Sequence, residues 1–316
     1  MTPPKSVASP SVASSSVTLL GADAGGSHST VVIGLADGRV LGRADGPGAS
    51  MKPGNATGSA AILAETARRA AAQAGVALPA DGAVVGAAGA GRAQEQAELE
   101  ATLREAGVAR RVRVLADGEV ALTTAFDRGP GVIVNAGTGS IAYARDPQGQ
   151  LHRAGGYGWQ LGDEGGGYWL GRRALDVAAR AQDGRGEGST LLARLLGALG
   201  LQQFDDLVRW TTTATPAQVA ALAPHVLNAA REGEAVARRA VDDAAQELVG
   251  LVVTLERRFP GAGPVPVALA GGLLLPQSPL TTAFRAQLAA ALKRARLVPN
   301  RIDPAVGALR LAAELE

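Results

Sequence analysis

Apolar runs alternate with glycine turns at the start of the chain and predict strands. The runs Val17–Asp23, Thr30–Ala36 and Arg39–Ala44 hold apolar residues in strand-like patterns. The pair Asp37-Gly38 separates the second run from the third and is a strong hairpin signal. The pattern therefore predicts three successive strands joined by tight turns.

Helical and strand patterns alternate in the segment that follows. In chain order they predict helix Thr57–Ala74, strand Ala83–Ala88, helix Ala93–Glu105 ended by Gly107, strand Val112–Leu115 and helix Glu119–Phe126. Three strands followed by this alternation are typical of a mixed α/β unit.

The strand pattern restarts at Gly131 and predicts a second α/β unit. Its expected elements are strands Val132–Ala136, Ser140–Arg145 and Gln150–Ala154, a turn at Asp146–Gly149, helices from Tyr168 to about Arg258 with breaks near Asp183–Gly188 and Thr211–Pro216, strand Val265–Leu269, helix Leu280–Arg294, and a last helix from Asp303-Pro304. We expect a disordered tail over residues 1–17, domains over 18–127 and 128–303, and a hinge at Asp127–Pro130.

Composition narrows the class of protein. The 316 residues are enough for two cores, and 47% of them are hydrophobic without a stretch long enough to span a bilayer. The net charge is +2 and the arginines are dispersed, so we expect neither a nucleic-acid nor a membrane partner. The absence of Cys excludes disulfides, thiolate metal sites and a Cys nucleophile. No apolar signal-peptide core precedes the first strand, which favours a cytoplasmic location.

Two glycine turns are the main candidates for chemistry. Gly25, Gly26 and Ser27 follow the first strand, and Asn135 to Ser140 (N-A-G-T-G-S) repeats the same form. Backbone N–H groups in such turns can surround phosphate oxygens, although an ordinary hairpin is the alternative for each. The pair of turns favours nucleotide phosphates. We expect Gly137 and Gly139 to require either positive φ or a close approach of other atoms.

Two carboxylates accompany these turns at the ends of predicted strands. Asp23 enters the first turn, where it can hold Mg²⁺ directly or through water. Asp117 follows the strand Val112–Leu115, where the alternatives are a general base and a helix N-cap. The two roles are compatible, because a helix start favours an ionised carboxylate.

A glycine- and aromatic-rich segment, Gly155–Gly171, predicts a sugar-binding loop. Two of the three Trp and two of the three Tyr residues of the chain lie in it, and aromatic faces suit stacking on a sugar ring. Asp163 is its candidate ligand for sugar hydroxyls. Trp159 and Trp169 have the alternative of anchoring the core, which we expect for Trp169.

The segments G-A-D-A-G-G-S-H-S, A-D-G-E-V-A, N-A-G-T-G-S and G-W-Q-L-G-D-E-G-G-G-Y-W-L-G carry a family resemblance. From Leu19 to Ala313, the chain resembles the N-acetylglucosamine kinase branch of the sugar-kinase, heat-shock chaperone and actin superfamily. That branch is grouped with the BadF/BadG/BcrA/BcrD ATPases. The resemblance implies two ribonuclease-H-like domains around a cleft, with the helix at 304–316 packing back on the first.

The resemblance also implies roles for individual residues. Asp23 would serve Mg²⁺, and Asp117 would activate a sugar 6-hydroxyl. The list of implied contacts is Gly25, Gly26, Ser27, Gly137, Thr138 and Gly139 for ATP phosphates, Gly271 and Gly272 for adenosine, and Asp117, Thr138, Gly139 and Asp163 for the sugar. ATP, Mg²⁺ and a small sugar are thus the expected ligands, with a homodimer among the candidate assemblies.

Several functions stay open at this point. The loop after Gly46 does not match the Asn and Trp sugar contacts of the animal enzymes, and Ala88 stands where those enzymes have a Ser near the acetamide. N-acetylglucosamine, glucosamine, N-acetylmuramic acid and glucose are therefore all candidate substrates. An activator of a 2-hydroxyacyl-CoA dehydratase would need Cys to hold an iron–sulfur cluster, which this chain lacks. A sugar sensor without catalysis is the remaining alternative.

Overall fold

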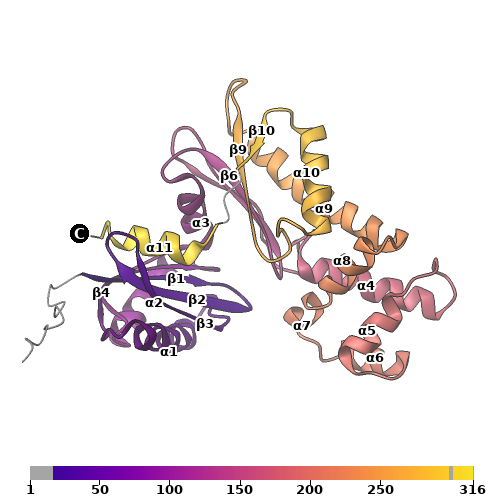
Figure 1. Cartoon of the computed structure of the whole chain (residues 1–316), viewed down its shortest axis with the longest axis horizontal. Coiled ribbons are helices and arrows are strands. Elements are labelled where there is room, and N and C mark those ends of the chain that lie inside the picture. The colour runs from indigo at the N-terminus through magenta and orange to yellow at the C-terminus, as the bar shows by residue number, and fades with distance from the viewer. Residues whose placement is uncertain (1–16, 299–301, 316) are drawn as a thin grey trace, which may run out of the picture.

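Two five-stranded sheets organise the chain, whose computed structural model describes residues 17–298 and 302–315 (Figure 1). The tail predicted for residues 1–17 lies outside this description, apart from Val17. The first sheet comprises β1 (Thr18–Ala24), β2 (His28–Leu35), β3 (Val40–Pro47), β4 (Ala80–Ala87) and β5 (Ala109–Ala116). The second comprises β6 (Gly131–Ala136), β7 (Ser140–Arg145), β8 (Leu151–Gly155), β9 (Val265–Ala270) and β10 (Ala295–Leu297).

The two sheets share one plan. Their strand orders are β3-β2-β1-β4-β5 and β10-β9-β6-β7-β8. In each, three antiparallel strands are joined in sequence, and two further strands add in parallel beside the first of them. This duplication confirms the predicted mixed α/β architecture. It also gives the β1–β2 and β6–β7 turns equivalent places in their sheets.

Eleven helices occupy the described part of the chain. The first unit contains α1 (Ala56–Ala74), α2 (Ala93–Glu105) and α3 (Asp117–Phe126). The second contains α4 (Gly167–Gln182), α5 (Leu191–Leu199), α6 (Phe204–Thr211), α7 (Pro216–Ala220), α8 (Ala223–Arg231), α9 (Ala235–Glu256) and α10 (Pro279–Ala291). The last is α11 (Pro304–Ala312).

The first sheet is covered on both faces. Helices α1 and α2 pack on one face, and α11 packs on β1, β2 and β4. Leu309 of α11 is buried beside Leu19. This approach depends on Gly21, because a Cβ there would lie 2.2 Å from both the Ala305 carbonyl oxygen and the Leu309 nitrogen. The end of the chain therefore completes the core of its beginning.

The second core is built around α9. Its buried residues pack against α4, α8 and α10 and against β6, β7 and β8. Figure 1 shows α4 to α8 gathered on the side of the molecule away from the first sheet. None of the helices in the described part combines the length and the apolar character that a bilayer crossing requires.

Several boundaries differ from the sequence-based expectation, and those of α10 and β5 are examples. The helix expected to reach Arg294 ends at Ala291, and β10 pairs in parallel with β9 after it. The backbone leaves the helical conformation at Leu292, with φ of −135° and ψ of 89°, and the Arg294 guanidinium beyond it binds Glu256 and donates to the Phe259 carbonyl oxygen at 2.6 Å. Strand β5 begins at Ala109, three residues before the predicted start, because backbone pairing with β4 extends beyond the apolar run.

Candidate active site

The two glycine turns meet in space. The Ser27 Oγ and Thr138 Oγ1 atoms are 2.6 Å apart, although the residues are 111 positions apart in the chain. Each turn is closed internally, as the Gly25 N–H donates to the His28 carbonyl and the Gly137 N–H donates to that of Gly139. The sequence-predicted phosphate-binding residues of both turns are therefore brought together.

Positive φ does not explain these glycines. Gly25, Gly26, Gly137 and Gly139 all lie outside the left-handed region, so for Gly137 and Gly139 the positive-φ alternative of our expectation is wrong. Gly139 is instead required by close approach, because a Cβ there would lie 2.1 Å from the Asp163 Oδ2. A Cβ at Gly137 or Gly26 would meet no other described atom within 4 Å. These two positions leave open space beside the backbone.

The third glycine turn adjoins the second. Gly271 has φ of 90°, and a Cβ on it would lie 2.3 Å from the Ala136 carbonyl oxygen. The Leu273 N–H donates to the same oxygen at 3.1 Å. A Cβ at Gly272 would meet nothing within 4 Å. The predicted adenosine-binding segment thus lies next to Ala136, at the start of the second glycine turn.

Asp117 is positioned by the junction of β5 and α3. Helix α3 begins at Asp117 itself and Ala116 is its N-cap, so the predicted N-cap role is wrong. The Asp117 Oδ1 instead accepts from the N–H of Gly118 at 2.9 Å. Burial raises the pKa of this carboxyl above its ordinary value, against the lowering effect of its hydrogen bonds. Burial therefore outweighs the helix-start effect that we expected to keep it ionised.

Tyr143 is a site residue that the sequence analysis missed. Its hydroxyl donates to the Asp117 Oδ1 at 3.1 Å, and burial next to that carboxylate raises the Tyr143 pKa above its ordinary value. Its ring lies against Gly118, where a Cβ would be 2.0 Å from a ring carbon. A single Tyr on an alternating strand carries no signal of this contact, since the partner lies 26 positions earlier in the chain.

Asp23 is a mostly buried carboxylate at the end of β1. Burial, together with the smaller effect of the Asp117 charge, raises its pKa from 3.8 to about 6, while His28 opposes the shift. No donor in the described part of the chain forms a hydrogen bond with the Asp23 carboxylate. Asp23 and Asp117 are thus neighbouring, partly exposed acids whose negative charges repel each other.

This arrangement fits Mg²⁺. A cation beside Asp23 would satisfy its unpartnered oxygens and relieve its repulsion with Asp117. Residues 17–298 and 302–315 contain no group of three or more His, Cys, Asp or Glu side chains that could hold a metal. Mg²⁺ characteristically uses one or two carboxylates together with water and substrate phosphates, so such a group is unnecessary.

Replacing Asp23 by Asn should stabilise the fold. The ionised carboxylate destabilises the protein above pH of about 6, and this effect fades as the pH falls toward the unfolded value of 3.8. A shift of about two units corresponds to at most about 3 kcal/mol of unfolding free energy at neutral pH. Urea unfolding at about pH 7.5 and about pH 4 measures this gain and its decline.

The exposed Asp176, whose partner is Arg172 at 3.4 Å, provides a matched control. Its change to Asn should alter the unfolding free energy by less than about 0.5 kcal/mol. An Asp23→Asn protein no more stable than the parent at neutral pH would contradict the assigned charge environment.

Asp163 lies against the second glycine turn. Its φ of 63° places a non-glycine residue in the left-handed region, which Asp and Asn tolerate better than other side chains. Its Oδ1 accepts from the Gly158 N–H at 3.2 Å, and burial raises its pKa. The structure therefore brings Asp163 to Gly139, as a shared sugar and phosphate site would require.

The aromatic residues of Gly155–Gly171 have different surroundings. Trp159 is 45% exposed and Tyr157 is 61% exposed, so neither is a core anchor. The rings of Trp159 and Tyr168 are 5.0 Å apart between centroids. Trp169 packs on the second core as expected, with the Arg173 guanidinium over its ring.

Comparisons with known proteins agree with this geometry. A model of the BadF/BadG/BcrA/BcrD ATPase family matches residues 20–312. The N-acetylmuramic acid/N-acetylglucosamine kinase of Clostridium acetobutylicum is 32% identical over 231 residues, which cover 72% of this chain and 76% of that protein.

Solved structures show the same relationship. A candidate N-acetylglucosamine kinase from Chromobacterium violaceum has a TM-score of 0.78 at 32% identity, covering 95% of this chain and all (100%) of that one. A ROK family glucokinase from Streptomyces griseus, solved with glucose and AMPPNP, has a TM-score of 0.60 at 18% identity over 94% of this chain and 99% of its own. These likenesses confirm the predicted actin-like ATPase fold. The chain belongs to the BadF/BadG/BcrA/BcrD ATPase family.

Proposed function

We propose that this protein is an ATP-dependent sugar kinase that phosphorylates the 6-hydroxyl of an amino sugar, with N-acetylglucosamine as the first candidate. The observation that carries the proposal is the meeting of the two glycine turns beside a pair of carboxylates whose pKa values are raised. Membership of an ATPase family supports ATP as the phosphoryl donor. The relatives named above support an amino sugar as the acceptor.

Asp117 is the proposed general base. A carboxylate with a raised pKa is a stronger proton acceptor, and it must be ionised to act. The Tyr143 hydroxyl and the Gly118 N–H both bind Oδ1, which leaves Oδ2 to accept the proton from the sugar hydroxyl. The oxygen of that hydroxyl then forms its bond to the γ-phosphorus as the bond to the β-phosphate oxygen breaks.

The glycine turns are the proposed phosphate-binding elements. The open space beside Gly26 and Gly137 allows phosphate oxygens to approach the backbone, and Ser27 and Thr138 add hydroxyl donors. Asp23 would hold Mg²⁺, which when bound neutralises charge on the phosphates. Gly272 leaves similar room for the adenosine.

Closure of two domains is part of the proposal. We place their boundary at Asp127–Pro130, between domains over residues 18–127 and 128–303. Asp127 has φ of 55°, and its carbonyl accepts from the Arg145 guanidinium at 2.5 Å. A segment fixed at one point can act as a pivot, and closing about it would exclude water from the transferred phosphoryl group.

Release of ADP, coupled to an optical assay, tests the activity. The panel should contain N-acetylglucosamine, N-acetylmuramic acid, glucosamine and glucose. N-acetylmuramic acid belongs in it because the name of the Clostridium acetobutylicum kinase includes that sugar as well. Sugar-dependent ADP release supports the kinase, and its position on the sugar follows from analysis of the product. Sugar binding without turnover would favour the non-catalytic sensor instead.

Replacing Asp163 by Asn should raise the sugar KM for every accepted sugar. A charge-assisted hydrogen bond contributes about 1.5–3 kcal/mol, so the expected increase is about 10- to 100-fold. Asn tolerates the left-handed backbone at this position, whereas Ala would add backbone strain. Initial-rate kinetics with saturating ATP provide the measurement. A changed preference among sugars with unchanged KM values would assign Asp163 to the 2-substituent instead.

A further inference from the structure

A groove lies along the outer edge of the first sheet. It consists of two hollows of about 250 and 440 Å³ that share Arg113 and Leu315 in their linings. None of its lining residues belongs to the site described above. The groove is therefore a feature that the proposed kinase chemistry does not use.

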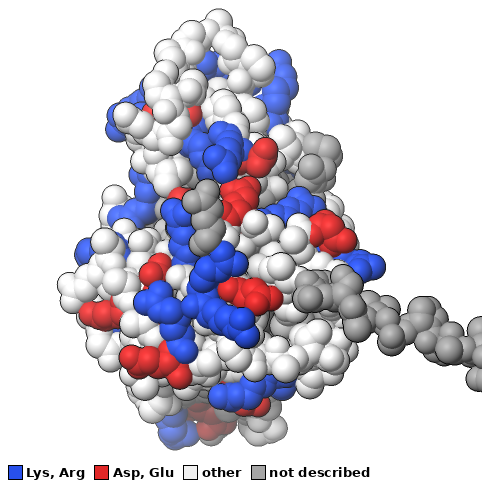
Figure 2. All heavy atoms as spheres, turned by 90° about the vertical axis from the view of Figure 1, so that its left-hand side faces the viewer, with Lys and Arg blue, Asp and Glu red and all other residues white. Residues whose placement is uncertain are grey.

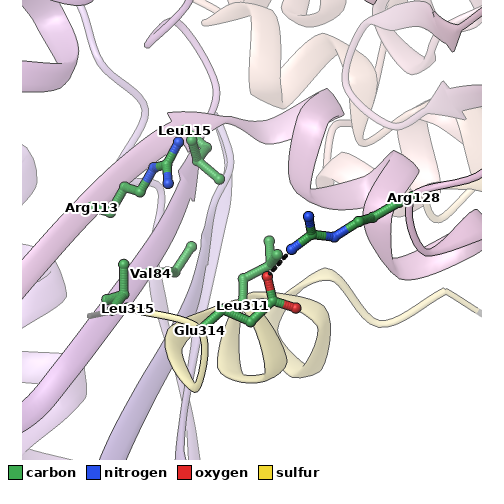
Figure 3. A pocket seen from close by; sticks show the side chains of 7 residues that line it. All are labelled: Val84, Arg113, Leu115, Arg128, Leu311, Glu314 and Leu315. Carbon is green, nitrogen blue, oxygen red and sulfur yellow. Dashed lines mark hydrogen bonds and ion pairs between the residues drawn. The ribbon is translucent and has the colours of Figure 1, made fainter. Parts of the chain in front are cut away.

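The smaller hollow has an apolar floor between two cations. Val84, Leu115, Leu311 and Leu315 line it together with Arg113, Arg128 and Glu314. Figure 3 shows Arg113 and Arg128 on opposite sides of the opening, with the apolar side chains between them. The hollow lies between α11, which packs mainly on β1, β2 and β4, and the edge strand β5.

The larger hollow is strongly basic. It is lined by Glu100, Arg104, Arg110, Arg111, Val112, Arg113 and Leu315. Figure 1 places the C-terminal end of the chain at the left-hand side of the molecule, and Figure 2 turns this side toward the viewer. Basic side chains gather at the centre of this face. Together the hollows contain five arginines and two glutamates. Glu316, which follows Leu315, lies outside the described residues and is not in this count.

Most of this positive charge is not neutralised. Within the described residues, the guanidinium groups of Arg104 and Arg113 form no ion pair or hydrogen bond, and that of Arg110 is 3.8 Å from Asp81. Arg111 donates to backbone carbonyl oxygens, one of them that of Leu315 at 2.7 Å, which leaves its charge uncompensated. Of these arginines, Arg128 has a close acidic partner among the described groove residues, Glu314 at 2.7 Å.

Protection of an edge strand against pairing with other chains is the simpler explanation of arginines on β5. It explains Arg111 and Arg113, which lie on one face of that strand. It explains neither Arg104, which comes from α2, nor the apolar floor beneath Arg113. Convergence of cations from separate elements over an apolar surface is instead what a ligand with a charged and an apolar part requires.

We propose that this groove binds a small organic phosphate, with the phosphate on Arg104 and Arg113 and the organic part on the floor formed by Val84, Leu115 and Leu311. Guanidinium groups bind phosphate oxygens through paired N–H donors, and the hollows have the volume of a small molecule. Nucleic acid is a poorer fit because the basic residues outside the groove are dispersed.

Calorimetric titration of the full chain with phenyl phosphate tests this proposal. Inorganic phosphate and phenol serve as the probes that have only the charge or only the apolar part. The titration should be repeated with a saturating non-hydrolysable ATP analogue, so that the proposed catalytic cleft is occupied. We expect phenyl phosphate to bind about tenfold more tightly than inorganic phosphate, because its ring is buried on the floor. Phenol should give no measurable heat.

The Arg104→Gln/Arg113→Gln double variant should weaken phenyl phosphate binding at least about tenfold. Arg68→Gln is the matched control, since Arg68 is an exposed arginine paired with Glu65 on α1. The proposal fails if phenyl phosphate does not bind, if the double variant binds it as well as the parent, or if only duplex DNA binds. Aggregation of the double variant without a lost binding signal would favour edge protection. These titrations need no turnover, so their outcome tests the groove independently of the proposed kinase activity.

Discussion

Replacing Asp117 by Asn is expected to lower kcat by about 10²- to 10⁴-fold, the usual contribution of general-base catalysis. Asn keeps the size of the side chain and can still accept from the Tyr143 hydroxyl and the Gly118 N–H. It cannot take the proton of the sugar hydroxyl at neutral pH. Steady-state kinetics on the preferred sugar measure kcat, and calorimetry with an ATP analogue measures nucleotide affinity, which should change little.

The pH profile separates this role from a structural one. Because the pKa of Asp117 is raised, kcat of the parent should fall as the pH drops, and the fall should begin above the range of an ordinary Asp. The Asn variant should lose this acidic limb. Removing a buried negative charge should not destabilise the variant, so a loss of fold cannot account for its low activity. Near-normal turnover would show that another group is the base.

Replacing Gly139 by Ala is expected to weaken sugar binding and to raise the sugar KM about 10- to 100-fold. The new Cβ would lie 2.1 Å from the Asp163 Oδ2 and 2.6 Å from its Cγ, so the carboxylate must move. Asp163 has little freedom to do so, because its backbone is held in the left-handed region and its Oδ1 binds the Gly158 N–H. Initial rates over a range of sugar concentrations measure the effect.

Gly137 and Gly250 provide two controls of different kinds. The Cβ of Ala at position 137 would meet no described atom within 4 Å, so this change should leave the fold and the sugar KM unchanged. It should weaken ATP binding, because the methyl group occupies space that the phosphate needs. Gly250 lies within α9 with open space beside it, and its change to Ala should be neutral or stabilising. If Gly139→Ala bound sugar as well as Gly137→Ala does, Asp163 would have no part in sugar binding.

Local patterns in the sequence were sufficient for most elements. Strand β7 (Ser140–Arg145) and helix α2 (Ala93–Glu105) have the predicted bounds. The turn residue Gly38 has the positive φ that the hairpin signal at Asp37-Gly38 requires. These features depend on neighbours within a few positions, so alternation, helical periodicity and glycine placement are enough to predict them. Strand β10, which the sequence analysis did not predict, depends instead on its partner β9 and has no local signal of its own.

The candidate site was only partly predictable for the same reason. Asp23, Asp117 and the glycine turns could be selected because each has a local context, a strand end or a turn. The contact of Tyr143 with Asp117 and the contact of Asp163 with Gly139 could not be predicted, since each depends on how separate elements pack. The pKa of Asp117 shows the limit most clearly. A helix start predicts an ionised acid, but burial, which only the folded chain determines, has the larger effect.

By itself the sequence determined the mixed α/β class, the duplicated glycine turns, the acids beside them and the exclusion of Cys chemistry. Only the tertiary structure decided that Ser27 and Thr138 meet and that α11 completes the first core. It alone brought arginines from β5, α2 and the segment after α3 together along one groove. The reason is physical: backbone conformation follows from nearby side chains, whereas burial, charge coupling and close approach arise only when distant segments pack together.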